Sequence, residues 1–192
     1  MPLHQQLGIA GAYVLTPEPV RDQRGWFTRY FCVDGFRETG RDVRFVQFNH
    51  SCTSRQGTIR GMHLQLGDAA EDKLVRCIRG RVLDVLVDLR RGSATLLRHV
   101  SVELSAADGR AVFIPRGVAH GFQSLCDNVE LLYHHSNYYT PRSEAGLRYD
   151  DPAVEIRWPL TAVDVSPKDR AWPLLAYGFS GFDVTLPPGE DG

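Results

Sequence analysis

Residues 58–65, with the sequence Thr-Ile-Arg-Gly-Met-His-Leu-Gln, place a histidine inside a stretch of the kind that forms a β-strand. His63 is flanked by Arg60 and Gln65, and Lys73 follows shortly after it. A histidine in such a position has three possible roles: a metal ligand, a base that removes a proton, or a hydrogen-bonded residue of the core. The rest of the sequence has to decide among these roles.

Another histidine, His120, closes a spaced pattern of glycine and proline. Gly109 is followed after five residues by Pro115-x-Gly117, and His120 follows after two more residues. This pattern resembles the second motif of the cupin superfamily of small β-barrels. Gly57 and His63 similarly fit the beginning of the first motif of that superfamily. The resemblance implies a cupin-like barrel.

The first motif departs from the superfamily pattern at two positions that bear on metal binding. Gln65 stands where the superfamily has a second histidine, and Lys73 stands where it has a glutamate. A divalent cation prefers neutral imidazole and carboxylate, so Lys73 would bring a positive charge to the ion and Gln65 would be a weak ligand. His63 and His120 alone would leave the ion two ligands short. We therefore expect no metal site.

Short strands with turns between them surround both histidines. The clearest predicted hairpin spans residues 73–89, with Gly80 in its turn. Further strands are expected at residues 11–16, 26–31, 45–51, 100–105, 111–114 and 129–139. Because strands recur at intervals of about 8–12 residues and helical periodicity is almost absent, the pattern predicts a mainly β fold, a barrel or a sandwich.

Helices are expected to be few and short, mostly toward the C-terminus. Residues 166–169, Ser-Pro-Lys-Asp, have the N-cap serine and the following proline that are typical of a helix start. Residues 33–40 are compatible with a short helix or a loop. Since no repeat or linker divides the chain, we expect one domain over residues 1–192, with residues 178–192 as a flexible tail.

Composition and charge narrow the range of partners. Of the 192 residues, 43% are hydrophobic and 23% are charged, and the net charge is −1. This balance is typical of a globular protein, and the low net charge argues against nucleic acid or an anionic membrane as a partner. The apolar runs are too short to span a membrane, and the first residues do not resemble an export signal. We therefore expect a cytoplasmic protein.

Several motifs of other protein classes are absent from the sequence. It has no GxGxxG after a predicted strand, no Walker A loop and no GxSxG elbow, which excludes dinucleotide-binding, P-loop and α/β-hydrolase sites of those types. No two cysteines form a CxxC pair. Free buried thiols are therefore expected, rather than a disulfide framework, at Cys32, Cys52, Cys77 and Cys126.

A closer resemblance covers most of the chain. Short blocks that resemble those of one protein family, in the order in which that family has them, occur at residues 22–25, 45–51, 60–63, 73–76, 88–93 and 114–122, and then at Tyr133, residues 138–139, 150–152 and 166–169. Together they resemble the dTDP-4-dehydrorhamnose 3,5-epimerase family, whose members belong to the cupin superfamily. The resemblance implies a jelly-roll barrel, a dTDP-4-keto-6-deoxy-sugar nucleotide as substrate, no cofactor and a homodimer.

The chemistry of such an epimerase needs a base, an acid and a group that stabilises an enolate. Carbons 3 and 5 of a 4-ketohexose are both α to the carbonyl, so a base can remove their protons, and an acid on the opposite face must return them. By resemblance, His63 is the base and Asp169 orients it. Tyr133 is then the acid, and Lys73 stabilises the enolate oxygen.

A substrate with a diphosphate also needs cationic and polar side chains around it. By resemblance, Arg24 and Arg60 bind the diphosphate, and Gln47 and Asn49 share one wall of the pocket. The family also implies His120 and Tyr138 near the sugar, and Glu144 and Lys168 near the nucleoside. Trp26 or Phe27 is a candidate to stack on thymine, with core packing as the alternative.

Each of the main residues also has a purely structural interpretation. His63 fits a hydrogen-bonded core position, and Asp169 fits the third residue of a capping box. Tyr133 fits an aromatic core position, whereas Lys73 fits the solvated start of a strand. At the level of function, the alternatives are a metal-dependent cupin enzyme and a non-catalytic sugar-binding barrel.

The sequence also departs from the family pattern beside the expected pocket. Arg29 and Leu64 stand where the family commonly has Glu and Tyr, and residues 134–137, His-His-Ser-Asn, replace a stretch that usually carries Lys and Asp. These differences leave epimerisation as the expected reaction. They leave open whether carbon 3, carbon 5 or both are epimerised.

Overall fold

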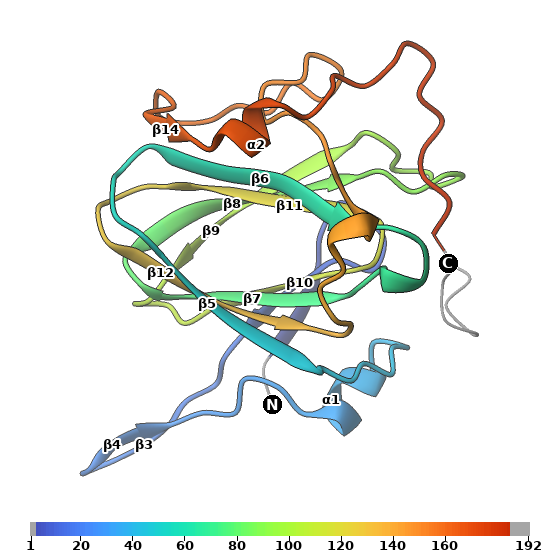
Figure 1. The fold of residues 1–192 in the computed structure, drawn as a ribbon. Helices are drawn as coiled ribbons and strands as arrows, with labels where there is room; N and C mark the ends of the chain where they lie inside the picture. The colour runs from blue at the N-terminus through green and yellow to red at the C-terminus, as the bar shows by residue number, and fades with distance from the viewer. Residues whose placement is uncertain (1–2, 185–192) are drawn as a thin grey trace.

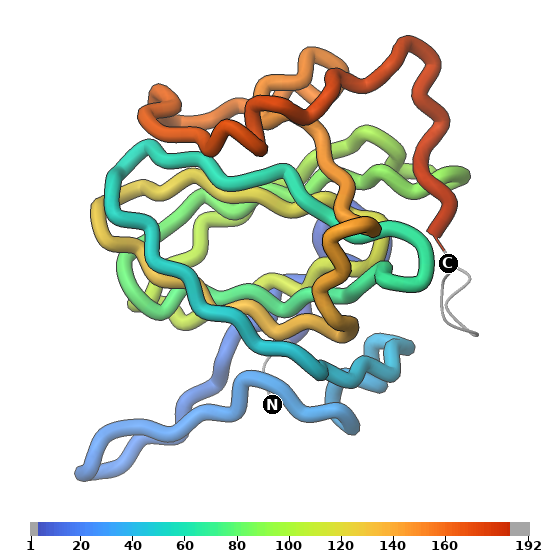
Figure 2. Tube along the Cα trace, in the orientation of Figure 1, coloured from blue at the N-terminus to red at the C-terminus, as the bar shows by residue number. Residues whose placement is uncertain are grey.

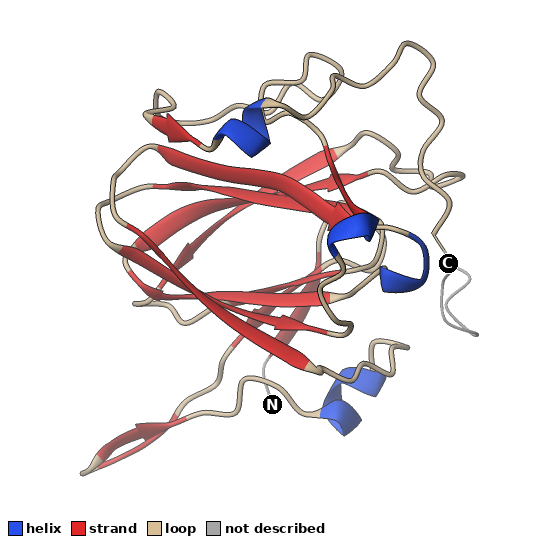
Figure 3. Ribbon diagram, in the orientation of Figure 1, coloured by secondary structure: helices blue, strands red, loops and turns tan. Residues whose placement is uncertain are grey.

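The computed structural model describes residues 3–184, which form a barrel of facing β-sheets (Figure 1). Across these residues one sheet has the strand order β1 (Leu3–Gln6), β2 (Tyr13–Thr16), β10 (Ala111–Ile114), β7 (Lys73–Arg79), β12 (Val129–His135) and β5 (Gln47–Thr53). The facing sheet has the order β13 (Glu144–Gly146), β6 (Thr58–Gln65), β11 (Val118–Ser124), β8 (Arg81–Asp88) and β9 (His99–Ser105), and β14 (Asp164–Val165) runs parallel beside β6. The predicted mainly β, cupin-like jelly-roll barrel is confirmed, and Figure 3 shows how little of the chain is helical.

The chain crosses repeatedly between the two sheets. The strands predicted on either side of Gly80 are present as β7 and β8, but β7 pairs with β10 and β12 whereas β8 pairs with β9 and β11. The prediction of a paired hairpin at residues 73–89 was therefore wrong. Gly80 has a φ of +74°, and a Cβ there would lie 2.8 Å from the Cys126 sulfur, so the crossing needs glycine.

Strand β11 was missed in the sequence because it lacks the alternation that marks a strand. All its residues are buried, since it lies between β6 and β8 and both of its faces are covered. A strand covered on both faces gives no period of two. The predicted strand at 26–31, in contrast, ends at Phe27 in β4 (Gly25–Phe27).

Hydrophobic side chains from both sheets meet inside the barrel. One buried cluster combines Val75 and Leu131 from the first sheet with Leu86 and Phe122 from the second. Burial of each such side chain contributes about 1.5–3 kcal/mol. A separate cluster that includes Met62 and Val87 lies under the C-terminal segment, which crosses the top of the view in Figure 1. The inner space between the sheets is thus framed by packed apolar side chains.

Short helices follow the strands at a few points. The helix expected at 166–169 is α2 (Pro167–Arg170), with Ser166 as its N-cap. The ambiguous segment at 33–40 contains α1 (Val33–Arg37), whose Phe36 is buried against Phe113. Single 3₁₀ turns occur at Gly67–Ala69 and Pro141–Ser143.

A hairpin arm of β3 (Val20–Asp22) and β4 projects away from the barrel (Figure 2). Its side chains include Val20, Trp26 and Phe27, which are 73%, 58% and 70% exposed. Neither aromatic residue of the arm is therefore part of the core.

The C-terminal segment is held against the barrel at least as far as Phe182. The Phe182 amide donates to the Leu89 carbonyl across 2.7 Å, and the Arg91 amide donates to the Phe182 carbonyl across 2.8 Å. The first part of the segment that we expected to be a flexible tail is thus paired to the body. Residues 185–192 of that expected tail lie outside the described residues.

Two further expectations concern cysteines and membranes. The cysteines are free thiols, as predicted, but only Cys77 among the four is buried, and Cys52 is exposed. Burial raises the pKa of the Cys77 thiol to about 11. Within the described part of the chain, none of the helices has the length and apolar character that a membrane span requires.

Candidate active site

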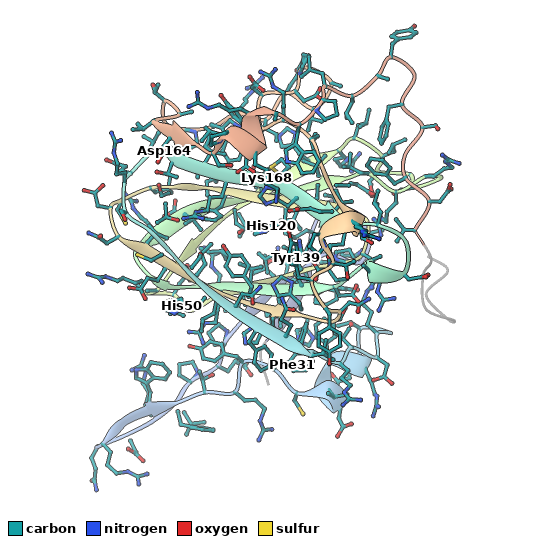
Figure 4. All side chains as sticks on the ribbon, in the orientation of Figure 1. Phe31, His50, His120, Tyr139, Asp164 and Lys168 are labelled. Atoms are coloured by element: carbon teal, nitrogen blue, oxygen red, sulfur yellow. The ribbon has the colours of Figure 1, made fainter. Side chains whose placement is uncertain are left out.

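A cavity of about 310 Å³ opens between the two sheets. Its walls are formed by polar and titratable side chains, namely Asn49, Ser51, Arg60, His63, Gln65, Glu71, Lys73, His120, Tyr133, His135, Tyr139 and Glu144, together with Leu64 and Phe122. Figure 4 shows the labelled His120 and Tyr139 between the sheets, whereas the labelled Phe31 lies below the barrel. The cavity therefore collects residues that are far apart in the sequence.

His63, on β6, forms a pair with Asp169 at the end of the molecule where α2 packs. His63 Nε2 donates to Asp169 Oδ1 across 2.6 Å, and the Gly61 amide donates to Asp169 Oδ2 across 3.2 Å. Asp169 is buried, whereas about a third of the His63 side chain remains exposed. Because Nε2 is held by the carboxylate, the other ring nitrogen, Nδ1, is the one available to a ligand.

The cap of α2 explains how Asp169 is positioned. Ser166 Oγ accepts a hydrogen bond from the Asp169 amide across 3.0 Å, which caps the helix. The Asp169 carboxylate meanwhile reaches β6 and bonds to His63 and Gly61. The amide of Asp169 therefore belongs to the helix cap, whereas its side chain is free of the cap and bonds to His63.

The charge on Asp169 is stabilised despite its burial. Burial alone would raise the pKa of this carboxyl, but the hydrogen bond and the charge of His63, with the Gly61 amide, outweigh it and keep the pKa below its usual value. Asp169 is thus a carboxylate near neutral pH. A carboxylate on Nε2 fixes the tautomer of His63 and leaves Nδ1 free to accept a proton.

Tyr133 enters the same cavity from the facing sheet. It lies on β12, and its hydroxyl is 3.1 Å from Ser51 Oγ on the neighbouring strand β5. Burial raises the pKa of Tyr133 to about 12, although the bond to Ser51 opposes the shift. The phenol therefore stays protonated at neutral pH. A histidine on β6 and a protonated phenol on β12 thus line one cavity from facing sheets.

His120 forms another histidine–carboxylate pair, beside His63. The two histidines are register partners on the adjacent strands β11 and β6, so their side chains belong to one face of the sheet. His120 Nε2 donates to Asp84 Oδ2 across 2.8 Å, and both residues are buried. Asp84 Oδ1 is buried without a hydrogen-bond partner among the described residues. The sequence did not single out Asp84.

Lys73 is buried at the start of β7, so it is not the solvated strand end that the sequence allowed. Its Nζ lies 3.3 Å from Glu71 Oε1 and donates to the His63 carbonyl oxygen across 3.4 Å. Glu71 also accepts from His135 Nδ1 across 2.9 Å. His135 lies two residues after Tyr133 on β12, so the alternation of the strand could have placed both side chains on one face. Nothing in the sequence pointed to Glu71.

Four of the residues predicted to bind the substrate do line the cavity: Asn49, Arg60, His120 and Glu144. Arg60 is held at the wall because its Nε donates to Thr53 Oγ1 across 3.0 Å. Lys168 reaches the rim, where it pairs with Glu144, and Glu144 also accepts from the Tyr139 hydroxyl across 3.1 Å. These residues together provide positive and negative charges and an aromatic ring at the open side of the cavity.

The other three residues predicted to bind the substrate lie away from the cavity wall. Gln47 lies behind it, where its Oε1 accepts from the Tyr139 amide across 3.1 Å. Tyr138 is 64% exposed, and its neighbour Tyr139 lines the cavity instead. Arg24 lies on the projecting arm, where its side chain is 85% exposed and paired with Asp22. The fold of one chain thus leaves Arg24 outside the site.

The donor set does not fit a metal ion. Among the described residues, no group of three or more His, Cys, Asp and Glu side chains is arranged to hold one. Gln65, at the position of the missing ligand, instead donates to the Ala69 and Tyr138 carbonyls, and its Oε1 accepts from the Thr140 amide. The structure uses this residue to tie loops together.

Comparison with known proteins shows the family to which the chain belongs. The sequence model of the dTDP-4-dehydrorhamnose 3,5-epimerase family matches residues 6–177. The chain is 44% identical over 169 residues to a dTDP-4-dehydrorhamnose 3,5-epimerase of Salmonella typhimurium, covering 87% of this chain and 92% of that protein. It is 40% identical over 171 residues to a dTDP-4-dehydrorhamnose 3-epimerase of Streptomyces niveus, covering 88% and 82%.

A solved structure extends the likeness to the fold. The chain superposes with a TM-score of 0.86 and 35% identity on a dTDP-6-deoxy-D-glucose-3,5-epimerase of Legionella pneumophila in complex with dTDP-4-keto-L-rhamnose. The match covers 97% of this chain and 100% of that one.

Proposed function

Since the chain belongs to the dTDP-4-dehydrorhamnose 3,5-epimerase family, we propose that it is an isomerase that epimerises a dTDP-linked 4-keto-6-deoxyhexose in deoxysugar biosynthesis. One observation carries the proposal. His63, paired with Asp169, and the protonated Tyr133 enter one cavity from facing sheets. Inversion at a carbon next to a carbonyl needs a base on one face and an acid on the other.

Proton removal is the role of His63. Its Nε2–H stays bonded to Asp169, and Nδ1 takes the proton from a carbon α to the C4 carbonyl. The electron pair of the broken C–H bond forms a C=C bond, and the carbonyl π electrons move to the C4 oxygen. The imidazolium that results is stabilised by the Asp169 carboxylate, since their charges are opposite and the carboxylate is shielded from water.

Lys73 stabilises the enolate oxygen that develops at C4. Its ammonium group lies in the cavity wall, on the strand that pairs with β12, and beside the backbone of His63. A cation held in a buried wall stabilises a developing oxyanion more than it would in water, because the local dielectric constant is lower. His120, next to His63 on the sheet, uses its Nε2–H for Asp84, so its Nδ1 can accept a hydrogen bond from a sugar hydroxyl.

Tyr133 returns the proton to the opposite face of the carbon. Its O–H bond breaks, the electron pair of the enolate C=C bond takes the proton, and the C4 carbonyl re-forms. The phenolate is left next to Ser51, whose hydroxyl can donate to it. Exchange with solvent then removes the added proton from His63 and returns a proton to Tyr133. The reaction needs no redox step and no cofactor.

The dTDP moiety is assigned to the open side of the cavity, where Arg60, Tyr139, Glu144 and Lys168 meet. We also propose a homodimer in which the arm of β3 and β4 packs on the partner. The exposed Val20, Trp26 and Phe27 support this assembly because isolated apolar arms are costly in water. In such a dimer Arg24, carried by the arm, would serve the diphosphate bound by the partner.

The position of inversion follows from a deuterium experiment. The protein is incubated in D₂O with dTDP-4-keto-6-deoxyglucose, and C3 and C5 of the sugar are examined by NMR. Deuterium at both carbons identifies a 3,5-epimerase. Deuterium at C3 alone identifies the narrower activity named for the Streptomyces niveus relative. Absence of deuterium at both carbons, with dTDP bound, would refute the proposed reaction.

A further inference from the structure

Glu71 bridges two cationic or titratable side chains in the wall of the cavity. Its Oε1 lies 3.3 Å from Lys73 Nζ, and its Oε2 lies 2.9 Å from His135 Nδ1. The Lys73, Glu71 and His135 side chains are only 9%, 6% and 11% exposed. A buried carboxylate is costly unless its oxygens are bonded, and here both oxygens are. The mechanism described above gives no task to Glu71 or His135.

The direction of the hydrogen bonds around His135 is set by a backbone amide. The Tyr139 N–H can only donate, so the Gln47 atom 3.1 Å from it is the oxygen, and the Gln47 NH₂ faces Asn49 Oδ1 at 3.5 Å. Asn49 Nδ2 then donates to His135 Nε2 across 3.2 Å. With Nε2 accepting, the ring proton lies on Nδ1 and is donated to Glu71.

The orientation of Glu71 in turn affects Lys73. A lysine side chain has several rotatable bonds, and burying it in one conformation is costly in entropy unless a partner holds it. Glu71 Oε1, at 3.3 Å, and the His63 carbonyl oxygen, at 3.4 Å, are the partners of Nζ. His135 holds the second oxygen of Glu71 and stacks on Tyr133 with a ring separation of 6.2 Å.

We propose that Glu71 and His135 are positioning residues for Lys73, which together aim its ammonium group at the enolate oxygen. The inference rests on the role proposed above for Lys73. It also accounts for part of the departure from the family pattern at residues 134–137, because His135 belongs to that stretch.

The arrangement has a pH dependence whose direction follows from the groups around Glu71. Lys73 on β7 and His135 on β12 face it directly, and Tyr133 lies behind His135. Burial would raise the pKa of Glu71, but the bond to His135 and the charge of Lys73 keep it below its usual value. Loss of His135 raises the pKa of Glu71. On acidification, Glu71 is then protonated, and ceases to hold Lys73 as a carboxylate, at a higher pH than in the wild type.

The sequence offers a direct probe of this network, because lysine occurs only at positions 73 and 168. Protein labelled with ¹³C-lysine therefore gives two sets of Cε signals, which Lys168→Arg assigns. Protonation of Glu71 on acidification is detected as a step in the Lys73 signal. We expect that step at higher pH in His135→Phe than in the wild type, and an intermediate position in His135→Asn, which keeps a donor toward Glu71.

Activity is measured on the same proteins. Glu71→Gln is expected to lower kcat about 100-fold, as a misplaced catalytic group does, while the Kd for dTDP changes less than about twofold. Glu130→Gln is the matched control, because Glu130 also lies between a histidine and a cation, His50 and Arg79, but away from the cavity. We expect Glu130→Gln to leave kcat and the Lys73 signal unchanged.

The outcomes separate this inference from the proposed function. Wild-type kcat in Glu71→Gln, or an identical Lys73 titration in the wild type and His135→Phe, would overturn the inference. If the wild type does not exchange substrate protons, the proposed function fails, and the lysine spectra still decide whether Glu71 and His135 hold Lys73. If Glu71→Gln does not fold, the comparison of His135→Asn with His135→Phe decides the question.

Discussion

Replacing Asp169 by asparagine tests the His63 tautomer with almost no change in shape. Asp169 accepts hydrogen bonds from His63 Nε2 and from the Gly61 amide, one on each oxygen. Asparagine has only one oxygen for these two donors. When that oxygen faces Gly61, the NH₂ group faces Nε2, and the imidazole proton moves to Nδ1. The nitrogen that faces the substrate can then no longer accept a proton.

The expected magnitude follows from a similar case. The corresponding substitution in the catalytic triad of serine proteases lowers kcat by about 10⁴ through the wrong tautomer. We expect a loss of about 10³–10⁴ for Asp169→Asn, because the amide can also adopt the other orientation for part of the time. This corresponds to about 4–5.5 kcal/mol of transition-state stabilisation.

The assay is the initial rate of deuterium uptake into the sugar in D₂O at saturating substrate. Asp164→Asn, an exposed position on β14 near α2, is the matched control and should keep the wild-type rate. Binding of dTDP to Asp169→Asn should be unchanged, since Asp169 is buried behind His63. A loss smaller than about tenfold would refute the assignment of His63 as a base whose tautomer Asp169 sets.

The same variant has a defined effect on stability. The folded-state pKa of Asp169 lies below its unfolded value of about 3.8. The carboxylate therefore stabilises the fold above that value, and this contribution is lost as the pH falls through the folded-state pKa. The difference in free energy of unfolding between wild type and Asp169→Asn should be larger at pH 7 than at pH 3. An equal difference at both pH values would contradict the assigned charge.

Further predictions concern the acid, metal ions and the packing of β6. Tyr133→Phe should slow formation of the inverted product about 100-fold or more while part of the exchange at the α carbons survives, and equal losses of both would contradict separate base and acid residues. Dialysis against EDTA should leave the exchange rate unchanged, and loss of activity restored by a divalent ion would revive a metal-dependent mechanism. Gly61→Ala should destabilise the fold by about 3 kcal/mol or more, measured by urea unfolding, because Gly61 has a φ of +131° and a Cβ there would lie 2.5 Å from the Gly121 Cα. A change below about 1 kcal/mol would show that β6 and β11 separate easily.

Much of the fold followed from local patterns. Strand β9, whose burial alternates, and strand β10, which ends just before Pro115, were predicted close to their observed bounds, because alternation and turn residues are local signals. The helix start at Ser166 was equally visible, since capping depends on neighbouring residues. The pairing of β7 and β8 was predicted wrongly, because a glycine turn between two strands does not reveal whether they share a sheet.

The candidate site divides in the same way. His63, Lys73, His120, Tyr133 and Asp169 were selected by residue type and motif, and the structure brings four of them to one cavity with Asp169 directly behind His63. The role of each residue there is still a prediction. Asp84, Glu71 and Ser51 were not selected, because a carboxylate or hydroxyl becomes informative only once its partner across the sheet is known.

The sequence by itself determined which side chains with chemical function the barrel carries and where many of its strands lie, because both depend on residue type and on neighbours along the chain. Only the tertiary structure decided which carboxylate meets which histidine, that Lys73 is buried against Glu71, and that Arg24 stays outside the cavity of its own chain. The physical reason is that strand register, the facing of the two sheets and the packing of α2 on β6 bring together residues far apart in the sequence, 108 positions in the case of Gly61 and Asp169. No local pattern contains that information.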